Sequence, residues 1–295
     1  MSFFRKAVWS LLLINIVHLS IFSLHTFAGG CGDVNNSGSI NIMDVAYVIN
    51  YLYKTGSTPQ FISQPKGTIT DYDGNIYNTV AIGSSADVDH SGKIDISDII
   101  YLIDYLYYGG DAPNCSDGQV WMAQNLKVTH YRNGDSIQKV PDYDDWFHLS
   151  TGAYCSYFNN DIFVDDYGRM YNWQAVNDTR NIAPDGWHVP SQDEWQILID
   201  ILGGGNSAGG KMKDTTHWTS PDPTATNESG FCGLPGGFRD IVDDYGGMPF
   251  YAGLWTATES NIREAFYWSL YHGNSRCDAS YTMKQDGFSI RCVKD

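Results

Sequence analysis

The stretch "GTITDYDGNIYNTVAIG" (Gly67–Gly83) decides how the rest of the sequence divides. It predicts a β-hairpin, because β-prone residues fill both arms and Asp73-Gly74 lies where a tight turn belongs. The segment after it, "SSADVDHSGKIDISD" (Ser84–Asp98), has the chemistry of a calcium loop. A near copy, "CGDVNNSGSINIMD" (Cys31–Asp44), precedes the hairpin. A predicted hairpin thus separates two copies of one predicted metal-binding unit.

The two loops belong to an internal duplication. At the constant offset that aligns Asp33 with Asp87, Gly38 aligns with Gly92 and "INYLY" aligns with "IDYLY". An in-register repeat is a strong signal in a single sequence, because it is independent of any one residue.

Each copy supplies oxygen ligands in the pattern of a calcium loop. Polar side chains stand at positions 1, 3, 5, 9 and 12, a backbone carbonyl is available at position 7, and glycine at position 6 allows the sharp turn. The spacing predicts two calcium ions, and the alternative is a polar turn that precedes a helix. The expected ligands are Asp33, Asn35, Ser37, the Ser39 carbonyl, Asn41 and Asp44 in the first loop, and Asp87, Asp89, Ser91, the Lys93 carbonyl, Asp95 and Asp98 in the second.

A helix is predicted after each loop. Apolar residues recur there at helical spacing: Val45, Val48, Ile49 and Leu52, then Ile99, Leu102, Ile103 and Leu106. The two apolar faces are expected to pack together as a small all-α domain. Over Gly32–Gly56 and Ala86–Gly110 this arrangement resembles a type I dockerin. The resemblance implies binding to a cohesin-like protein through the helices and loop positions 10 and 11, which are Ile42, Met43, Ile96 and Ser97.

A second resemblance begins at Gln119. The segments "QVWMAQNLKV", "YGRMYNWQAV", "APDGWHVPSQDEWQIL" and "GFSIRCVKD" follow one another to Asp295, and together they resemble the Fibrobacter succinogenes major paralogous (FISUMP) domain. Short strands dominate here, with "AFYWSLYH" and "GFSIRCVKD" predicted as paired core strands, and Ser191 and Glu194 predict a capping box that starts a helix. The pattern predicts an α+β domain, and its closing strand, early helix and aromatic turns resemble the C-type lectin-like fold.

The hairpin is expected to belong to this larger domain, because the start of the FISUMP family resembles the hairpin running directly into Gln119. We therefore expect two interleaved domains: a dockerin repeat at 31–56, the hairpin at 67–83, the second repeat at 84–115 and the main part at 119–295. Gly83 and Gln119 must then lie close together, and chain entropy permits this because loop closure costs rise slowly with length. The alternative is a rearranged or misassembled gene.

The first residues predict export from a bacterial cell. Residues 1–28 combine a basic start, an apolar run and a small-residue site that ends at Ala28, which is typical of a signal peptide. An uncleaved membrane anchor is the alternative. "AGGC", ending at Cys31, is similar to a lipoprotein attachment site, so a membrane is an expected partner only if Cys31 is lipidated. The mature protein is expected to be secreted or held at the cell surface.

Export makes the six cysteines candidates for disulfides, because oxidising compartments favour them. None forms a C-x-x-C pair, which leaves zinc and redox chemistry without support. A Cys31–Cys115 bond would tie the ends of the dockerin together. The C-type lectin-like resemblance implies the further pairs Cys155–Cys292 and Cys232–Cys277.

Composition excludes one class of partner. The formal net charge is −16, from 18 Lys and Arg against 34 Asp and Glu. Such a surface repels phosphate backbones, so no nucleic acid is expected to bind, whereas hard cations suit it.

Two features suggest catalysis. "GNSAG" (205–209) fits the G-x-S-x-G pattern, but a helix is predicted before the serine where a nucleophile elbow needs a strand. The pairs Asp144-Asp145 and Asp165-Asp166 suggest a glycosidase, which needs two carboxyls facing each other across a cleft. Glu194 is expected to be a helix cap and His188 a packed strand-end residue. We therefore expect no catalytic residue.

The leading hypothesis is an exported, non-catalytic modular protein. Its dockerin would bind a cohesin-like receptor or scaffold, and its lectin-like domain would bind a surface or polysaccharide, in a polysaccharide-degradation context implied by association. Sugar binding would depend on exposed aromatics such as Trp146, Trp218 or Trp255. The alternatives are a glycoside hydrolase that cleaves O-glycosyl bonds in polysaccharide catabolism, and a structural surface component whose dockerin halves pair only within the molecule.

Overall fold

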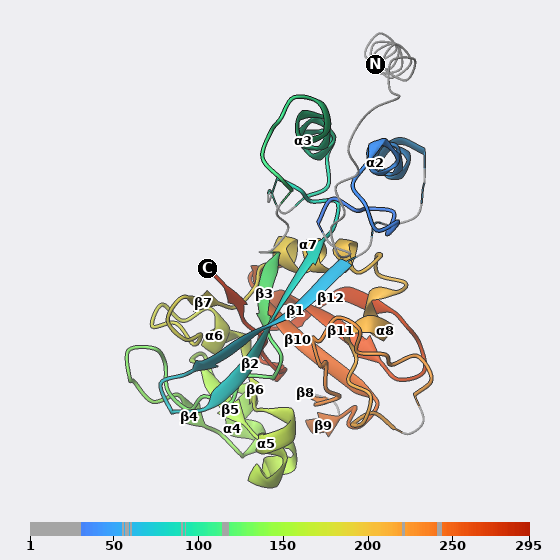
Figure 1. Cartoon of the computed structure of the whole chain (residues 1–295). Helices are drawn as coiled ribbons and strands as arrows, with labels where there is room; N and C mark the ends of the chain where they lie inside the picture. The colour runs from blue at the N-terminus through green and yellow to red at the C-terminus, as the bar shows by residue number, and fades with distance from the viewer. Residues whose placement is uncertain are drawn as a thin grey trace.

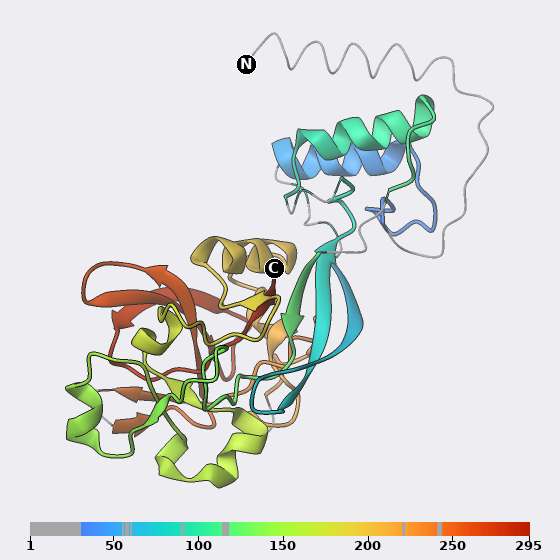
Figure 2. The same cartoon turned by 90° about the vertical axis from the view of Figure 1, so that its left-hand side faces the viewer.

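The computed structural model describes residues 31–54, 56, 59, 61–89, 91, 93–113, 118–219, 222–240 and 244–295. The expected signal peptide lies outside these residues, as does Cys115 of the expected Cys31–Cys115 pair. Figures 1 and 2 show a pair of helices joined by a narrow waist to a larger part made of sheets and short helices. Over the described ranges, no helix combines the length and apolar character needed to cross a membrane. The architecture is α+β.

The helical pair consists of α2 (Ile42–Lys54) and α3 (Ile96–Tyr107), which lie side by side. Their apolar faces meet in one core that also receives side chains from both loops. A capping box between Asp95 and Asp98 fixes the start of α3. The periodicity of the sequence predicted both faces correctly. The buried members of this core are Val34, Ile40, Val45, Val48, Ala86, Val88, Ile99 and Leu102.

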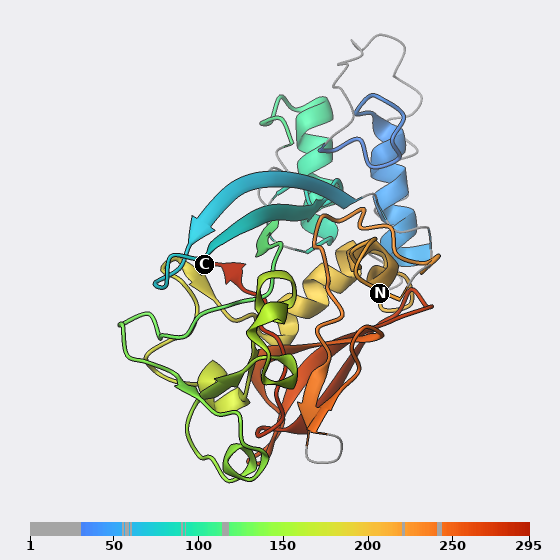
Figure 3. The same cartoon turned by 90° about the horizontal axis from the view of Figure 1, so that it is seen from below.

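The predicted hairpin is present and belongs to a five-stranded sheet. β1 (Phe61–Thr70) pairs with β2 (Ile76–Ser84), so the hairpin begins earlier than expected and bulges between Pro65 and Gly67. The strand order is β1-β2-β3-β13-β7, and all four pairings are antiparallel. The other three strands are β3 (Gln119–Met122), β7 (Trp187–His188) and β13 (Val293–Lys294). Figure 3 shows β1 and β2 running together across the larger part.

The two ends of the segment between β2 and β3 meet at the helical pair's base. Ile82 pairs with Gln119, which brings Gly83 and Gln119 together as expected. The approach is close, because a Cβ added to Gly118 would lie 2.4 Å from the Gly83 Cα. The other repeat is tied in nearby, since the Gly32 N–H donates to the Ser85 carbonyl (2.9 Å). Segment 84–118 therefore leaves the sheet and returns to it at one place.

Three smaller sheets complete the strands. β10 (Tyr251–Glu259), β11 (Glu264–Tyr271) and β12 (Cys277–Met283) form an antiparallel sheet with β11 in the middle. The expected pairing of "AFYWSLYH" with "GFSIRCVKD" is wrong, because β11 already has partners on both edges and β13 pairs with β3 and β7. The remaining strands are β4 (Gln138–Lys139), β5 (Ala153–Cys155), β6 (Met170–Tyr171), β8 (Phe238–Asp240) and β9 (Asp244–Gly246).

Helix α7 (Gln192–Ile201) starts at the predicted capping box of Ser191 and Glu194. Its buried face, which includes Trp195 and Leu198, packs in one cluster with Ile82 of β2 and Trp121 of β3. The hairpin therefore supplies part of the core of the larger domain. The other helical elements are α4 (Tyr143–Phe147), η1 (Tyr157–Asn159), η2 (Asp161–Phe163), α5 (Val164–Tyr167), α6 (Trp173–Val176) and α8 (Ala208–Met212).

Candidate metal centre

The second loop gathers three carboxylates. Asp87 lies three residues after the end of β2, Asp89 lies two residues further on, and Asp98 stands in the first turn of α3. One oxygen from each of these side chains lies within 4.8 Å of the others. Asp87 and Asp98 are buried, so their charges face each other with little screening by water. Like charges this close favour a cation between them.

Backbone N–H groups hold the Asp98 carboxylate in place. Its Oδ1 accepts from the Val88 N–H (2.7 Å) and its Oδ2 from the Asp95 N–H (2.8 Å). Burial, together with the nearby Asp89 and Asp87, raises the pKa of Asp98 to about 6. Burial of the charged Asp98 carboxylate near two other carboxylates therefore costs free energy. A bound cation would lower that cost.

The first loop has the same framework with fewer charges. Both oxygens of Asp33 accept from the loop, from the N–H groups of Ser37 (2.8 Å) and Gly38 (2.7 Å). Asp44 accepts from the N–H groups of Asn35 (3.1 Å) and Asn41 (2.8 Å), as Asp98 does in its own loop. Burial, with the charge of Asp33 adding to it, raises the pKa of Asp44. The structure brings the predicted ligands of this loop together around two carboxylates.

The donor set fits calcium. Every side chain predicted to bind the metal offers oxygen, as carboxylate, amide or hydroxyl, and calcium prefers six to eight such oxygens in a flexible arrangement. The position 7 carbonyls are turned toward their loops, since the Ser37 hydroxyl donates to the Ser39 carbonyl (3.2 Å) and the Ser91 hydroxyl to the Lys93 carbonyl (3.1 Å). A bound ion would offset the negative charge of the carboxylates in each loop.

The residues predicted to bind a partner lie at the starts of the two helices. Met43 in α2 is 61% exposed, and Ile96 in α3 is 41% exposed. Ser97 is exposed as well, and Ile42 is half-buried. Exposed apolar side chains next to the metal loops form a surface that a partner protein can cover. The loop geometry presents this surface, because Asp95 and Asn41 cap the helices at these positions.

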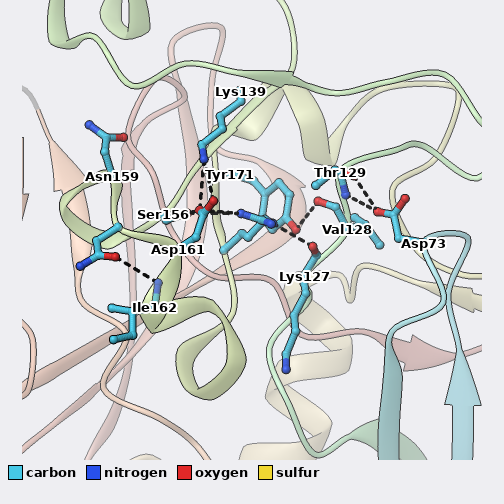
Figure 4. Close-up of polar contacts among 12 residues, drawn as sticks. Asp73, Lys127, Val128, Thr129, Lys139, Ser156, Asn159, Asp161, Ile162 and Tyr171 are labelled. Atoms are coloured by element: carbon cyan, nitrogen blue, oxygen red, sulfur yellow. Dashed lines mark hydrogen bonds and ion pairs between the residues drawn. The ribbon is translucent and has the colours of Figure 1, made fainter.

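The turn of the hairpin is fastened to the larger domain. Asp73 accepts hydrogen bonds from the backbone N–H and the hydroxyl of Thr129 (2.5 and 3.0 Å), which Figure 4 shows. Beside it, Asp161 accepts from Lys139 (2.9 Å) and from Ser156, and so holds the loop that carries Asn159 and Ile162. The Asp73 contacts join the hairpin to the larger domain at the end far from the metal loops, and the Asp161 contacts lie within the larger domain.

The expected aromatic sugar platforms are wrong. Trp146, Trp218 and Trp255 are buried, with exposed fractions of 0%, 4% and 0%. Each indole N–H is consumed by a backbone carbonyl, as in the bond from Trp255 to Tyr171 (2.8 Å). Sequence spacing could not separate these core residues from surface ones, because polar residues precede Trp146 and flank Trp218 although both are buried.

The catalytic patterns have structural explanations. The Ser207 hydroxyl in "GNSAG" donates to the Gly203 carbonyl (2.9 Å), and this turn joins α7 to α8 rather than a strand to a helix. Asp144 and Asp145 lie in the first turn of α4, and Asp165 and Asp166 in the first turn of α5, where carboxylates favour the helix dipole.

His188 makes contacts that the sequence did not reveal. It ends β7, as expected, and its Nε2 lies 2.7 Å from Glu194 Oε1 while its Nδ1 lies 2.7 Å from Asp295 Oδ1. Burial opposes the charged imidazole, but the hydrogen bonds to these two carboxylates prevail and raise the pKa of His188. Glu194 also accepts from the Ser191 N–H, so its predicted role as a cap is confirmed. The contact with Asp295 joins segments far apart in sequence, so no local sequence pattern predicts it.

The two expected disulfides in the larger domain are absent, because Cys155, Cys232, Cys277 and Cys292 are free. Cys155, Cys277 and Cys292 are buried in three different apolar clusters, so the predicted partners do not meet. Cys232 instead accepts a hydrogen bond from Asn227 Nδ2 (3.2 Å). Burial raises the pKa of the Cys155 thiol to about 11, which keeps it protonated and inert.

These features define a calcium-loop docking module joined to an α+β domain. The chain belongs to the Fibrobacter succinogenes major domain family, whose family model matches residues 117–294. The model of the dockerin type I domain matches residues 31–107, a range that spans the hairpin. No curated protein and no solved structure shows significant similarity to the chain. A type I dockerin binds calcium and implies calcium-dependent docking to a cohesin in a modular protein, typically extracellular or at the cell surface.

Proposed function

We propose that this protein is an exported, non-catalytic adaptor. Its dockerin attaches it to a cohesin-like receptor, and its larger, lectin-like domain binds a polysaccharide or another cell-surface ligand. The observation that carries the proposal is the Asp87, Asp89 and Asp98 carboxylate cluster next to the exposed Ile96 at the start of α3, with the exposed Met43 at the corresponding position of α2. A metal that orders the loops also orders the surface beside them.

The proposal includes two calcium ions, one in each loop. The backbone hydrogen bonds to Asp44 and Asp98 correspond, which supports equivalent roles for the two position 12 ligands. The remaining side chains at positions 1, 3, 5 and 9 complete each site. With four carboxylates against two, the second site binds calcium more tightly.

The interleaved domain order is also part of the proposal. The pairing of β2 with β3 and the packing of Ile82 against Trp121 and Trp195 support assignment of the hairpin to the larger domain. The shared core of α2 and α3 supports assignment of both flanking segments to the dockerin. Such mutual burial would not be expected of a randomly rearranged gene.

A receptor-binding assay tests the adaptor function. A type I cohesin immobilised on beads is expected to retain the calcium-loaded chain and to release it when a chelator is added. Circular dichroism on the same samples reports whether the helices α2 and α3 lose order as calcium is removed. The proposal is contradicted if the chelator does not change the amount of chain retained, or if no chain is retained at any calcium concentration.

A second assay addresses the larger domain. Because its adjacent acids occupy the first turns of α4 and α5, we expect binding to polysaccharides without turnover. Release of reducing sugar that a single Asp or Glu substitution abolishes would establish a hydrolase instead.

A further inference from the structure

The larger domain contains a cavity that is widely open to solvent and has a volume of about 400 Å³, within the range of small-molecule sites. Three segments form it: residues 150–152 before β5, α6 with the turn that follows it to Thr179, and Lys284 after β12. None of its lining residues belongs to the calcium loops or to the helical pair. The cavity therefore offers a binding site independent of docking.

The charged groups in the wall are committed to protein partners. Asp178 is held by Arg180 in a two-point contact, with Nε and Nη2 at 2.8 and 2.7 Å from its oxygens. Lys284 lies 2.9 Å from Glu259 and 4.5 Å above the ring of Trp173. Because each charge is already balanced, the cavity has no free charge that would select an ionic ligand.

The rest of the lining consists of neutral hydrogen-bonding groups. Hydroxyls come from Ser150, Thr151 and Thr179, and amides from Gln174 and Asn177. Hydroxyls and amides both donate and accept, which matches the hydroxyl groups of a sugar. Trp173 supplies the apolar surface of the wall. This composition favours a neutral, hydroxyl-rich ligand.

One acceptor in the wall awaits a donor. Gln174 Oε1 is shielded from solvent and accepts no hydrogen bond from any residue that the structure describes. A shielded acceptor without a donor costs free energy. Gln174 is half-buried, so a ligand that turns its side-chain amide to face the cavity and donates to Oε1 recovers that cost. Among the lining groups, a hydrogen bond from a ligand hydroxyl to Gln174 Oε1 therefore gives the largest gain in binding free energy.

The walls are rigid before any ligand arrives. Asn172 joins two of them, because its Oδ1 accepts from the Ala153 N–H (2.9 Å) and its Nδ2 donates to the Thr151 carbonyl (2.9 Å). The Trp173 indole is fixed by its bond to the Thr256 carbonyl (2.9 Å). A preformed site loses little entropy on binding, so a few hydrogen bonds suffice.

We infer that this cavity binds one sugar unit of a neutral polysaccharide, with Gln174 Oε1 accepting a ligand hydroxyl. The inference rests on the proposed recognition of polysaccharide by the larger domain and gives that recognition a place. The sequence suggested that sugar would stack on exposed tryptophans. Here the sugar is instead held by hydrogen bonds in the neutral cavity.

Titration of the full, calcium-loaded chain tests the inference. The probes are D-glucose, D-xylose, D-mannose and D-galactose, their β-linked disaccharides, and D-glucuronate as a charged comparison, followed by calorimetry and saturation-transfer NMR. The test variants are Gln174→Leu, which removes the acceptor, and Thr151→Val, which removes a rim hydroxyl. Gln196→Leu on the exposed face of α7 is the matched control. Sedimentation with insoluble cellulose and xylan extends the test to polymers.

We expect saturable binding of at least one neutral sugar, weakened about fivefold to tenfold by Gln174→Leu and unchanged by Gln196→Leu. The Gln174→Leu sample should keep the melting temperature and the circular dichroism spectrum of the wild type, which shows that the larger domain folds, and it should still bind cohesin beads. Absence of saturable binding by a wild-type sample that docks normally overturns the inference and leaves the docking function intact. The inference is also overturned if both test variants bind the sugar with the affinity of the wild type. Preference for glucuronate over the neutral sugars, or binding to free sugars without any binding to polymers, overturns it as well.

Discussion

The second calcium loop can be converted toward the first by a single change. Asp89→Asn places in the second loop the amide that the first loop has at Asn35. The loop should keep its shape, because Asn35 Oδ1 accepts from the Ser37 N–H (2.9 Å) just as Asp89 Oδ1 accepts from the Ser91 N–H (3.0 Å). The substitution therefore removes one charge and retains the local hydrogen bond.

Two opposing charge interactions set the size of the effect. A carboxylate oxygen about 2.4 Å from a divalent ion contributes about 3.5 kcal/mol of attraction at the dielectric constant of water, which suits the partly exposed Asp89. The ligand oxygens of Asp87, Asp89 and Asp98 lie within 4.8 Å of one another. The loop opens when calcium leaves, so the repulsion between these carboxylates exists only in the calcium-bound state. Removing the Asp89 charge thus also relieves about 0.9 kcal/mol of repulsion with each of the two neighbouring carboxylates on binding. The difference, about 1.7 kcal/mol, predicts about twentyfold weaker calcium binding.

Calorimetric titration of the full chain with calcium, at fixed ionic strength and neutral pH, measures this effect. The wild type should show a tight and a weak site, and Asp89→Asn should weaken the tight one. The reciprocal change Asn35→Asp is the control and should strengthen the weak site. Equal sites in the wild type, a weakened weak site in Asp89→Asn, or no change in either variant would refute the reasoning from charge count.

Three further predictions concern docking, folding and pH. Met43→Asp combined with Ile96→Asp should weaken retention on cohesin beads at least about tenfold without lowering the melting temperature, because both side chains are exposed. Gly118→Ala should destabilise the larger domain by about 1–3 kcal/mol in denaturant unfolding, because the new Cβ would lie 2.4 Å from the backbone of β2; an unchanged midpoint would contradict the close crossing. Burial raises the pKa of Asp286 to about 6, so its protonated form favours the fold, and stability should fall as pH rises from about 4 to 6. Asp286→Asn should flatten that fall and gain up to about 3 kcal/mol at neutral pH, measured at constant calcium against the wild type.

The calcium loops could be predicted from the sequence because their chemistry is local. All the predicted ligands of one loop lie within twelve consecutive positions, and the glycine at position 6 and the helix that follows are part of the same pattern. The hairpin was predictable for a similar reason, since Asp73-Gly74 and its β-prone arms are contiguous. Duplication then supplied a second, independent copy of the loop signal.

The features that sequence reasoning missed depend on contacts across the chain. Whether Trp146 or Trp255 is buried depends on which distant carbonyl its indole reaches, at Gln285 and Tyr171. The contact between His188 and Asp295 likewise joins residues far apart in sequence. For Gln174, the neighbouring residues in the sequence do not indicate that its side-chain oxygen is shielded from solvent. The two disulfides expected in the larger domain are wrong because fold resemblance cannot say which apolar cluster receives each cysteine.

The proposed interleaved order would hold the docking module firmly against the larger domain. An ordinary modular protein joins its domains by one linker, whereas here two strands of a single sheet, β2 and β3, cross the boundary side by side. Only Ser85 and Ala86 separate the end of β2 from the first predicted ligand, Asp87, and Ala86 is already buried in the core of the helical pair. The backbone at Ala86 therefore cannot change its torsion angles without disrupting either the end of β2 or the core of the helical pair. The orientation of the docking surface relative to the larger domain is therefore set by the sheet, and the calcium loop begins where the sheet ends.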